Sequence, residues 1–389
     1  MNGKTIAIHI HSLHGGGAER VTTHLASYLA SQGHSVTLIT TEDSKSDFYS
    51  LDTRVRRVSL GRVKSQWKYS RKFAELLRRL RTLRRTIRDT KPDVVLGVMT
   101  VNLLMVIIAT VGLPVAVIGS ERNYPGLKRL GFHYALLRRL LYRFSTLHIA
   151  QTDETAAWLR RHCGIERLTV IPNAVVWPLS SGPPVLLPQH LVQQEKCIIL
   201  AVGSFSMQKG FDLLVEAFSE ISDNLPNAVL VIVGGPGMKD RTGDQKTRIE
   251  ELVARHNLAD KVLMPGPVGN ISDWYARADI FVLSSRYEGF PNVLLEAMAA
   301  GCAAVSFNCK TGPSEIIEHR RNGLLVPVEN ISSLAEAILD LATNTGLRSE
   351  LSNAAKGVRD VYSQERIMKR WEQAIELAAE HSRANGSNA

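Results

Sequence analysis

The chain has 389 residues, 44% hydrophobic and 22% charged, which is the composition of a globular protein and a length that favours two domains. Its four cysteines lack the spacing of a structural zinc site, and a strand pattern from residue 4 argues against a cleaved signal peptide, so a reduced cytosolic protein is expected. The net charge of +10 is uneven, because residues 1–172 carry 27 Lys and Arg against 12 Asp and Glu, and the first half is therefore expected to meet an anionic partner.

Strand and helix patterns alternate from the N-terminus, which predicts a doubly wound α/β domain over residues 1–175. Strands are predicted at 5–11, 35–41, 94–100, 115–120, 147–152 and 168–175, and helices at 18–31, 66–88, 101–113 and 153–162. The stretch 94–120 has no charged residue and is long enough to span a membrane. Its division into strand, short helix and strand, with Pro114 before the last, favours instead the buried part of a parallel sheet.

The second half repeats the alternation after a break. Residues 176–195 are rich in Pro, Ser and Gln, which predicts a linker. The following domain is expected over 196–363, with strands at 197–204, 228–235, 261–266, 280–285 and 303–308. Residues 364–389 hold an amphipathic helix, around 364–381, and a tail. Two such domains facing across a cleft would place ligand sites at the carboxyl ends of the strands.

A glycine-rich turn follows the first predicted strand and opens a helix. It contains Gly15, Gly16 and Gly17. A dinucleotide fingerprint would need a further glycine where this chain has Arg20, although Glu42 or Asp43 could take the place of the ribose-binding acid. The glycines also allow the backbone to approach a phosphate or a sugar at a helix N-terminus, or they make a tight turn and nothing more.

Four features of the second half follow strands and therefore point to one edge of one sheet. These are Gly203, Lys209 with Gly210, the glycine turn that contains Gly235, and the segment EGFPNVLLE from Glu288 to Glu296. Lys209 could reach a phosphate or could be a solvated surface lysine. Glu288 and Glu296 flank the start of a helix predicted over 292–300, where acids stabilise the helix dipole or bracket a ligand with phosphate and hydroxyl groups.

These segments resemble the donor domain of the retaining glycosyltransferases of family 4, which have the GT-B fold of two facing Rossmann-like domains. The matching segments are 202–210, 229–237, 261–266, 278–307, 312–317 and 322–327, with 14–21 and 170–175 in the first half. The resemblance spans nearly the whole chain. It implies that the C-terminal helix packs back on the N-terminal domain.

The resemblance also implies the reaction, which is transfer of a hexose-type sugar from a nucleotide diphosphate with retained anomeric configuration. No cofactor and no metal are expected, since the sequence has no Asp-x-Asp motif between strand and helix. Glu288 would lie beside the donor sugar, Glu296 would accept hydrogen bonds from the ribose, and Lys209 would clamp the diphosphate. The other donor-binding candidates are Gly15, Gly16, Gly17, Gly203, Ser204, Gly235, Gly266, Gly289, Phe290 and Asn292. Ser204 stands where such proteins usually carry an arginine.

A second departure from the family lies at the end of an N-terminal strand. Many relatives have a histidine near the acceptor there, whereas this chain has Glu121, Arg122 and Asn123. Arg122 could bind an anionic acceptor and Glu121 could take the acceptor proton. The two could equally form an ion pair at the rim of a cleft.

The basic first half suggests what the acceptor is. Residues 54–91 hold 15 Lys and Arg and two acids on an amphipathic pattern, and a second basic, aromatic stretch covers 127–144. The acceptor or membrane candidates are Arg78, Arg81, Arg84, Arg85, Arg88, Lys128 and Arg129. This pattern suits an anionic membrane surface, and the protein is expected at the cytoplasmic face of the inner membrane. Because similar transferases extend lipid-linked diphosphate glycans, the resemblance implies an acceptor of that kind.

Three other classes of protein compete with this interpretation. A nucleic-acid-binding protein would fit the basic charge, but the glycine and acid motifs would have no role in it, so no nucleic acid is expected. A sugar-nucleotide epimerase of similar fold, and a transferase with a soluble acceptor, stay open as alternatives.

Overall fold

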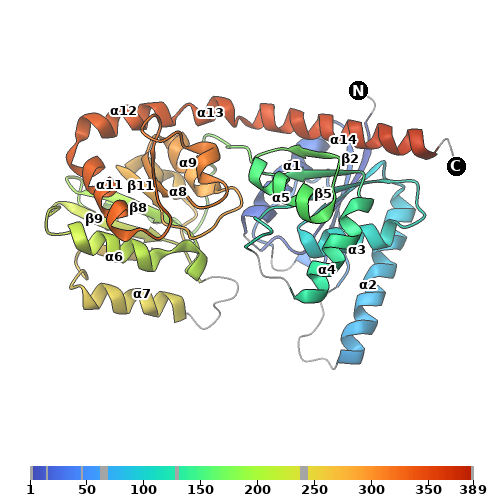
Figure 1. Ribbon diagram of the computed structural model, residues 1–389, viewed down its shortest axis with the longest axis horizontal. Coiled ribbons are helices and arrows are strands. Elements are labelled where there is room, and N and C mark those ends of the chain that lie inside the picture. Colours follow the sequence, from blue (N-terminus) through green and yellow to red (C-terminus); the bar gives the residue numbers. More distant parts are fainter. Residues whose placement is uncertain are drawn as a thin grey trace. The chain divides into compact units, whose positions relative to one another are not determined.

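The computed structural model describes residues 3–14, 16–44, 47–61, 69–127, 131–236 and 244–386, and only the backbone of 69–73 and 385–386. The chain divides into two compact units (Figure 1). The N-terminal unit comprises Met1–Ala174 and Glu365–Ala389, and the C-terminal unit comprises Val175–Gln364. Residues 176–195, for which a linker was expected, are therefore part of the C-terminal unit.

The N-terminal unit is built on a seven-stranded parallel sheet in the order β3-β2-β1-β4-β5-β6-β7. Its strands are β1 (Thr5–Ile10), β2 (Ser35–Thr40), β3 (Arg56–Ser59), β4 (Val94–Val98), β5 (Ala116–Ser120), β6 (Leu147–Ala150) and β7 (Leu168–Val170). Its helices are α1 (Gly17–Ser31), α2 (Tyr69–Thr90), α3 (Thr100–Thr110), α4 (Phe132–Leu141), η2 (Tyr142–Phe144), α5 (Asp153–Cys163) and α14 (Gln364–Gly386). The strand order reverses between β1 and β4, which is where doubly wound sheets bind ligands.

Both faces of this sheet are covered, and this explains the uninterrupted apolar runs. Ile6 and Ile8 of β1 pack in a core cluster with α1 and α14, whereas Ala7 packs on the other face with α2, α3 and α5. The uncharged stretch 94–120 forms β4, α3 and β5, which confirms its interpretation as buried sheet and helix. Over the ranges that the structure describes, none of the helices combines the length and the apolar character needed to span a bilayer.

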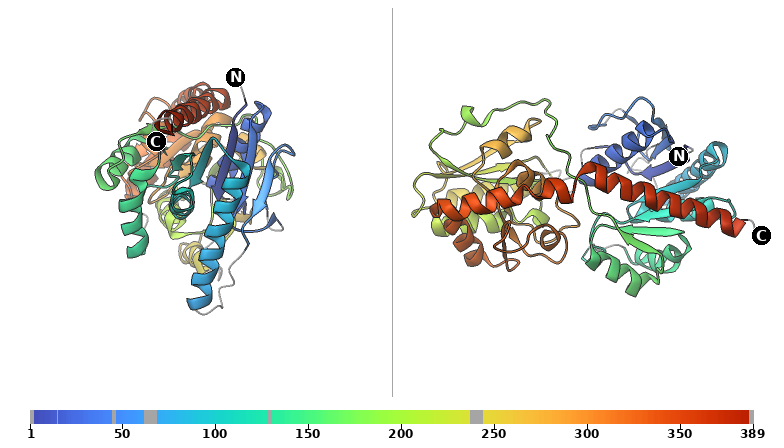
Figure 2. Two further views of the ribbon diagram at one scale, coloured as in Figure 1. Left: turned by 90° about the vertical axis from the view of Figure 1, so that its right-hand side faces the viewer. Right: turned by 90° about the horizontal axis from the view of Figure 1, so that it is seen from above.

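Helix α14 completes the N-terminal unit rather than the unit that precedes it in the chain. Met368, Trp371 and Ile375 are buried in the same core cluster as β1 and α1. An ion pair from Lys4 Nζ to Glu376 Oε1, 2.9 Å long, joins its outer side to the start of β1. Figure 2 shows α14 lying along this unit. The expected return of the C-terminal helix to the N-terminal domain is thus confirmed.

The C-terminal unit has a six-stranded parallel sheet in the order β10-β9-β8-β11-β12-β13. Its strands are β8 (Cys197–Val202), β9 (Ala228–Val233), β10 (Val262–Gly266), β11 (Ile280–Leu283), β12 (Ala303–Phe307) and β13 (Leu324–Val326). Its helices are η3 (Pro188–His190), η4 (Met207–Lys209), α6 (Phe211–Ile221), α7 (Asp244–Arg255), α8 (Ile271–Arg277), α9 (Asn292–Ala300), α10 (Pro313–Ile316), α11 (Ile331–Thr343), α12 (Thr345–Ala355) and α13 (Val358–Val361). The predicted doubly wound α/β architecture is confirmed for both units.

Candidate functional site

The carboxyl ends of β8, β9 and β10 meet through their glycines. The Gly203 amide donates to Val233 O over 3.0 Å, and the Gly234 amide donates to Gly266 O over 3.1 Å. A Cβ added to Gly234 would lie 1.7 Å from Gly203 O, so no other residue can hold this approach. The structure therefore brings Gly203, Gly235 and Gly266 to one edge of the sheet, where their backbone can come close to a ligand.

Lys209 reaches across this edge from the loop before α6. It ends η4, and Gly210 follows in the left-handed conformation with φ +61°. The lysine stem lies over Gly203, because a Cβ there would come within 3.1 Å of the Lys209 Cε. The lysine carbonyl accepts a hydrogen bond from Ser284 Oγ at 2.9 Å, which ties the loop to the end of β11.

Glu288 is the partner of Lys209. Its side chain is 7% exposed, and its Oε1 accepts hydrogen bonds from Lys209 Nζ at 2.6 Å and from Ser285 Oγ at 2.7 Å. Thr311 Oγ1 donates to the Glu288 carbonyl, which holds the loop from the other side. The site thus contains a preformed cation and carboxylate at the glycine-lined edge, and the cation can turn to an anionic ligand.

Arg286 joins the loop after β11 to the start of α6. Its Nη1 and Nη2 each donate to one oxygen of Asp212 at 2.8 Å, and its Nε donates to Glu329 at 2.7 Å. The hydrogen bonds to Asp212 outweigh burial and raise the pKa of Arg286 above its ordinary value. This bidentate pair holds in place the two segments that carry Lys209 and Glu288. Sequence reasoning did not single out Arg286, Asp212 or Ser285, although all three lie inside or beside the quoted segments.

Helix α9 covers Asn292–Ala300, as predicted, and begins after Pro291. Glu296 is buried one turn inside it and accepts a hydrogen bond from Tyr275 Oη at 3.3 Å. Phe290 is buried in the core, with its ring 5.6 Å from that of Tyr362, so its side chain packs and only its backbone can meet a ligand. Gly289 lies in the same loop as Phe290, and Ser204 is exposed after β8.

The glycine turn of the N-terminal unit is described in part. Gly16 precedes α1 and Gly17 is its first residue, whereas Gly15 lies outside the described residues. The ring of His14 approaches Glu42, with 3.0 Å between Nε2 and Oε2. Glu42, which could take the place of the ribose-binding acid in a dinucleotide fingerprint, thus contacts a histidine of the same turn.

Glu121 and Arg122 are buried, at 2% and 6% exposure, and each has a partner other than its neighbour. Glu121 Oε1 accepts hydrogen bonds from Thr100 Oγ1 at 2.9 Å and from Tyr142 Oη. Burial and the Glu121 charge raise the pKa of Tyr142 well above its usual value, so the phenol stays a donor.

Arg122 Nη2 donates to Asn173 Oδ1 at 2.5 Å, and burial lowers the pKa of Arg122 to about 10, which leaves it cationic at neutral pH. The ion pair between Glu121 and Arg122 that was considered is not what the structure contains. Asn173 lies in the segment 170–175 that carried the resemblance, and this was the available signal for it.

The arginines of α2 differ in whether their side chains contact another segment of the unit. Arg78 pairs with Glu75 and donates to Leu60 O at 3.0 Å. Arg84 Nη1 donates to two carbonyls at the end of α3, Ala109 O at 2.8 Å and Val111 O at 2.7 Å, and so caps that helix. Arg78 and Arg84 are nevertheless exposed, as are Arg81, Arg85 and Arg88, which make no such contact with another segment of the described residues; Arg88 Nε lies 3.9 Å from Asp89 Oδ1. Lys128 and Arg129 lie outside the described residues. Within the described ranges no group of three or more His, Cys, Asp or Glu is arranged to hold a metal ion.

Two family models match successive parts of the chain. Residues 15–176 match Glycosyltransferase Family 4, and residues 186–358 match Glycosyl transferases group 1.

Similar proteins have been found in several organisms. An uncharacterized glycosyltransferase of Haemophilus influenzae is 26% identical over 360 residues, which are 92% of this chain and 95% of the relative. The Campylobacter jejuni GalNAc-alpha-(1->4)-GalNAc-alpha-(1->3)-diNAcBac-PP-undecaprenol alpha-1,4-N-acetyl-D-galactosaminyltransferase is 24% identical over 375 residues, 96% of this chain and 98% of that protein.

Solved structures share the fold at lower identity. Sucrose-phosphate synthase from Thermosynechococcus elongatus superimposes with a TM-score of 0.84 at 20% identity, covering 95% of this chain and 98% of that one. Anabaena HepE in complex with UDP superimposes with a TM-score of 0.80 at 17% identity, covering 96% and 99%. Because the two family matches follow each other along the chain and correspond to two Rossmann-like sheets, the chain belongs to the glycosyltransferases of family 4 and has the GT-B fold.

Proposed function

We propose that this enzyme transfers a hexose or N-acetylhexosamine from a UDP-sugar to a lipid-linked diphosphate glycan, with retention at the anomeric carbon. The observation that carries the proposal is the ion pair of Lys209 and Glu288 at the glycine-lined edge of the C-terminal sheet. Support for the donor comes from HepE, which was solved with UDP and with UDP-glucose. Support for the acceptor comes from the C. jejuni relatives, whose names specify diphospho-undecaprenol glycans.

The chemistry follows from where charge develops. When the glycosidic bond to the nucleotide breaks, the diphosphate gains negative charge and the sugar becomes cation-like. Lys209 turns to the diphosphate, the N-terminal amides of α6 and α9 stabilise the same charge, and Glu288 stays beside the sugar. Ser204 offers no cation, so Lys209 carries a larger share than it would beside an arginine. Glu296 accepts hydrogen bonds from the ribose hydroxyls.

The paired acids of α9 and its preceding loop test the donor assignment. Glu296→Gln should weaken UDP binding ~10-fold or more, because hydrogen bonds to a charged acceptor contribute about 1.5–3 kcal/mol. Glu288→Gln should lower kcat more than it raises KM. Calorimetric titration with UDP and steady-state kinetics measure the two effects, and Glu336→Gln, an exposed acid on α11, is the matched control. Unchanged binding and turnover in both variants would exclude this donor site.

We further propose that transfer needs no metal ion. Lys209 and the helix N-termini supply positive charge where a metal would, and the sequence has no Asp-x-Asp motif. The initial rate of sugar transfer should therefore be the same with and without EDTA. Strong inhibition that added Mg²⁺ or Mn²⁺ reverses would contradict this.

The acceptor would be met at an anionic membrane, at the cytoplasmic face of the inner membrane. Three exposed arginines of α2, Arg81, Arg85 and Arg88, support this by their charge, since each basic residue near an anionic bilayer contributes about 1 kcal/mol. Arg84 is excluded from this set by its contacts with α3, and Arg78 by its pairing with Glu75.

A further inference from the structure

Helix α4 places its charged and apolar side chains in the opposite way to an ordinary surface helix. Its buried side chain is the charged one, Arg138, whereas its large apolar residues before Leu141 are at least one-third exposed; Leu141 packs against the core. Phe132 is 82% exposed, and Phe144 of the adjoining η2 is 64% exposed. The other exposed apolar side chains of α4 are Tyr134, Leu136, Leu137 and Leu140. Water is an unfavourable environment for such a face, and contiguous exposed apolar side chains mark an interaction surface.

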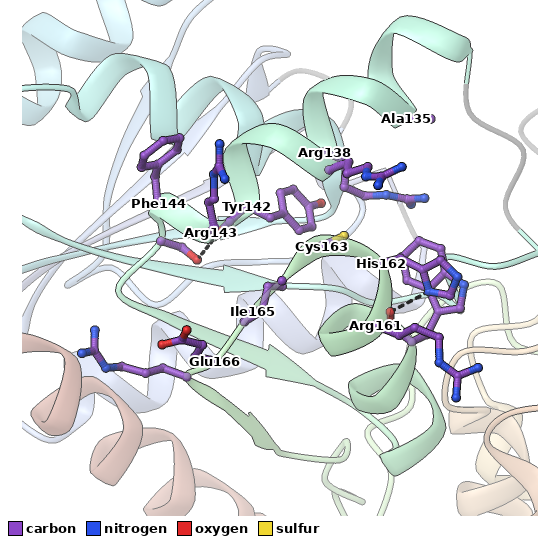
Figure 3. A pocket seen from close by; sticks show the side chains of 15 residues that line it. Ala135, Arg138, Tyr142, Arg143, Phe144, Arg161, His162, Cys163, Ile165 and Glu166 are labelled. Atoms are coloured by element: carbon purple, nitrogen blue, oxygen red, sulfur yellow. Dashed lines mark hydrogen bonds between the residues drawn. The ribbon is translucent and has the colours of Figure 1, made fainter.

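A cationic pocket lies beside this helix, between α4 with η2 on one side and the end of α5 on the other. We call it the α4–α5 pocket; its volume is about 820 Å³. Figure 3 shows Arg138 and Tyr142 on one side of the pocket and Arg161 and His162, from the end of α5, on the other. The basic lining residues are Arg138, Arg139, Arg143, Arg161, His162 and Arg167. Glu166 is the acid in the lining, and none of the five arginines forms an ion pair with a carboxylate of the described ranges.

Arg138 is a buried cation with an unpaired hydrogen-bond donor. It is 7% exposed, and its guanidinium lies over the Trp158 ring at 4.5 Å from the ring centre. Its Nη1 is buried and has no hydrogen-bond partner. A buried donor of this kind is normally satisfied, because leaving it unpaired is costly, and most of all for a charged group.

Helix dipoles account for only part of this charge. The last turns of α4 and α5 hold Arg138 with Arg139 and Arg161 with His162, where cations stabilise the exposed carbonyls. That effect does not reach Arg167, which follows α5 in a loop, and it gives no reason to bury Arg138. The clustered guanidiniums therefore point to an anion, and their planar forks match phosphate oxygens in pairs.

We propose that the α4–α5 pocket binds the phosphate group of a membrane lipid while the apolar side chains of α4 enter the bilayer interface. The inference rests on the proposed function in one respect, that this unit faces a membrane. The two features require the same occupant, since a lipid is the ligand that brings phosphate and hydrocarbon together. Tyr142 lines the pocket and donates to Glu121, so the bound phosphate lies one side chain from this buried carboxylate, which the sequence suggested as the group that takes the acceptor proton.

Vesicle flotation with the full-length protein tests this proposal. The probes are vesicles of phosphatidylcholine alone, of phosphatidylcholine with phosphatidylglycerol, and of phosphatidylcholine with farnesyl diphosphate. Wild type should float with both anionic vesicles and poorly with the first, because the choline cation of phosphatidylcholine neutralises its phosphate. Arg161→Gln with Arg167→Gln should reduce the apparent affinity ~10-fold or more, because two basic contacts are lost. Arg160→Gln with Arg56→Gln removes the same charge from exposed residues outside the pocket and should have a much smaller effect.

A second pair of variants tests the apolar face. Leu136→Ser with Leu140→Ser should weaken flotation at all salt concentrations, whereas Leu191→Ser with Leu377→Ser, two exposed leucines elsewhere, should not. Circular dichroism and thermal melts establish that all four double variants are folded. Equal loss in the pocket pair and its charge control would mean that only net charge matters, and the proposal would be overturned. It would also be overturned if soluble pyrophosphate bound the pocket as tightly as the lipids do and Leu136→Ser with Leu140→Ser floated like wild type.

Flotation requires no donor nucleotide, so this test is independent of the test of the proposed function. If Glu296→Gln keeps normal UDP binding while the pocket variants fail to float, the donor assignment is wrong and the lipid pocket stands. The reverse pattern removes the pocket and leaves the donor site.

Discussion

Lys209→Ala is expected to lower kcat by ~10²-fold or more, which is the effect of losing one group that stabilises developing negative charge. The loss should fall on kcat more than on KM, because the leaving diphosphate gains charge only as the glycosidic bond breaks. The lysine also neutralises Glu288, which keeps a hydrogen bond from Ser285 after the substitution. Steady-state kinetics with a UDP-sugar and a lipid-linked acceptor measure the change.

Two further variants separate the direct role of the lysine from its pairing with Glu288. If the loss arose only because Glu288 was left buried without a cation, Lys209→Ala should cost nothing further in the background of Glu288→Gln. We expect the double variant to be clearly less active than Glu288→Gln alone. Lys246→Ala removes a half-buried lysine of α7 that pairs with Glu250, and it should leave kcat unchanged. A loss below threefold for Lys209→Ala would contradict the leaving-group role.

Gly210→Ala is expected to destabilise the C-terminal unit by about 3 kcal/mol or more and to reduce turnover together with stability. The residue has φ +61°, and an added Cβ would lie 2.1 Å from Ser284 O. This oxygen and the Ser284 carbonyl carbon, at 3.2 Å, are backbone atoms, so no side-chain rotation can relieve the overlap. Lys209 must therefore move away from the end of β11. Urea unfolding followed by circular dichroism gives the free energy of unfolding.

Gly266→Ala is the matched control for this effect. Gly266 also has a positive φ, +88°, but a Cβ there would meet nothing within 4 Å. It should therefore show only the backbone strain of a non-glycine residue, about 1 kcal/mol. Equal destabilisation by the two substitutions would show that the close approach of Gly210 to β11 is unimportant.

The residue pattern alone was sufficient for most of the secondary structure and for one edge of the site. Strands such as β1 and β9 are continuous apolar runs, because a parallel sheet covered on both faces buries every side chain. The glycines and Lys209 follow successive strands, and parallel strands end at the same edge, so their meeting could be inferred. Helix α9 was predicted to its ends because Pro291 and Gly301 bound a stretch without a helix breaker.

Two short outer strands could not be predicted in this way. β3 reads RRVS and has no apolar run, and β13 is LLV, three apolar residues that are too few to identify a strand by themselves. Each is an outer strand that exists because an inner strand, β2 or β12, offers it a row of backbone donors and acceptors.

Only the tertiary structure decided which residues are the hydrogen-bond partners of the charged side chains. Adjacent charges in the chain suggested a pair between Glu121 and Arg122, yet folding brings Tyr142 to the first and Asn173 to the second. Arg84 looked like one of several surface arginines, and it caps α3.

Helix α4 illustrates the physical reason most clearly. Its periodicity indicates an amphipathic helix, but periodicity does not state which face turns inward. That choice depends on the free energy of the whole packed unit, in which Arg138 lies over Trp158 and the leucines are left to the surface. The sequence by itself therefore determined most of the elements, the family and the donor edge, because these depend on local patterns and on the order of parallel strands. Only the tertiary structure decided the partners of buried charges and the outward face of α4, because those depend on contacts between residues far apart in the chain.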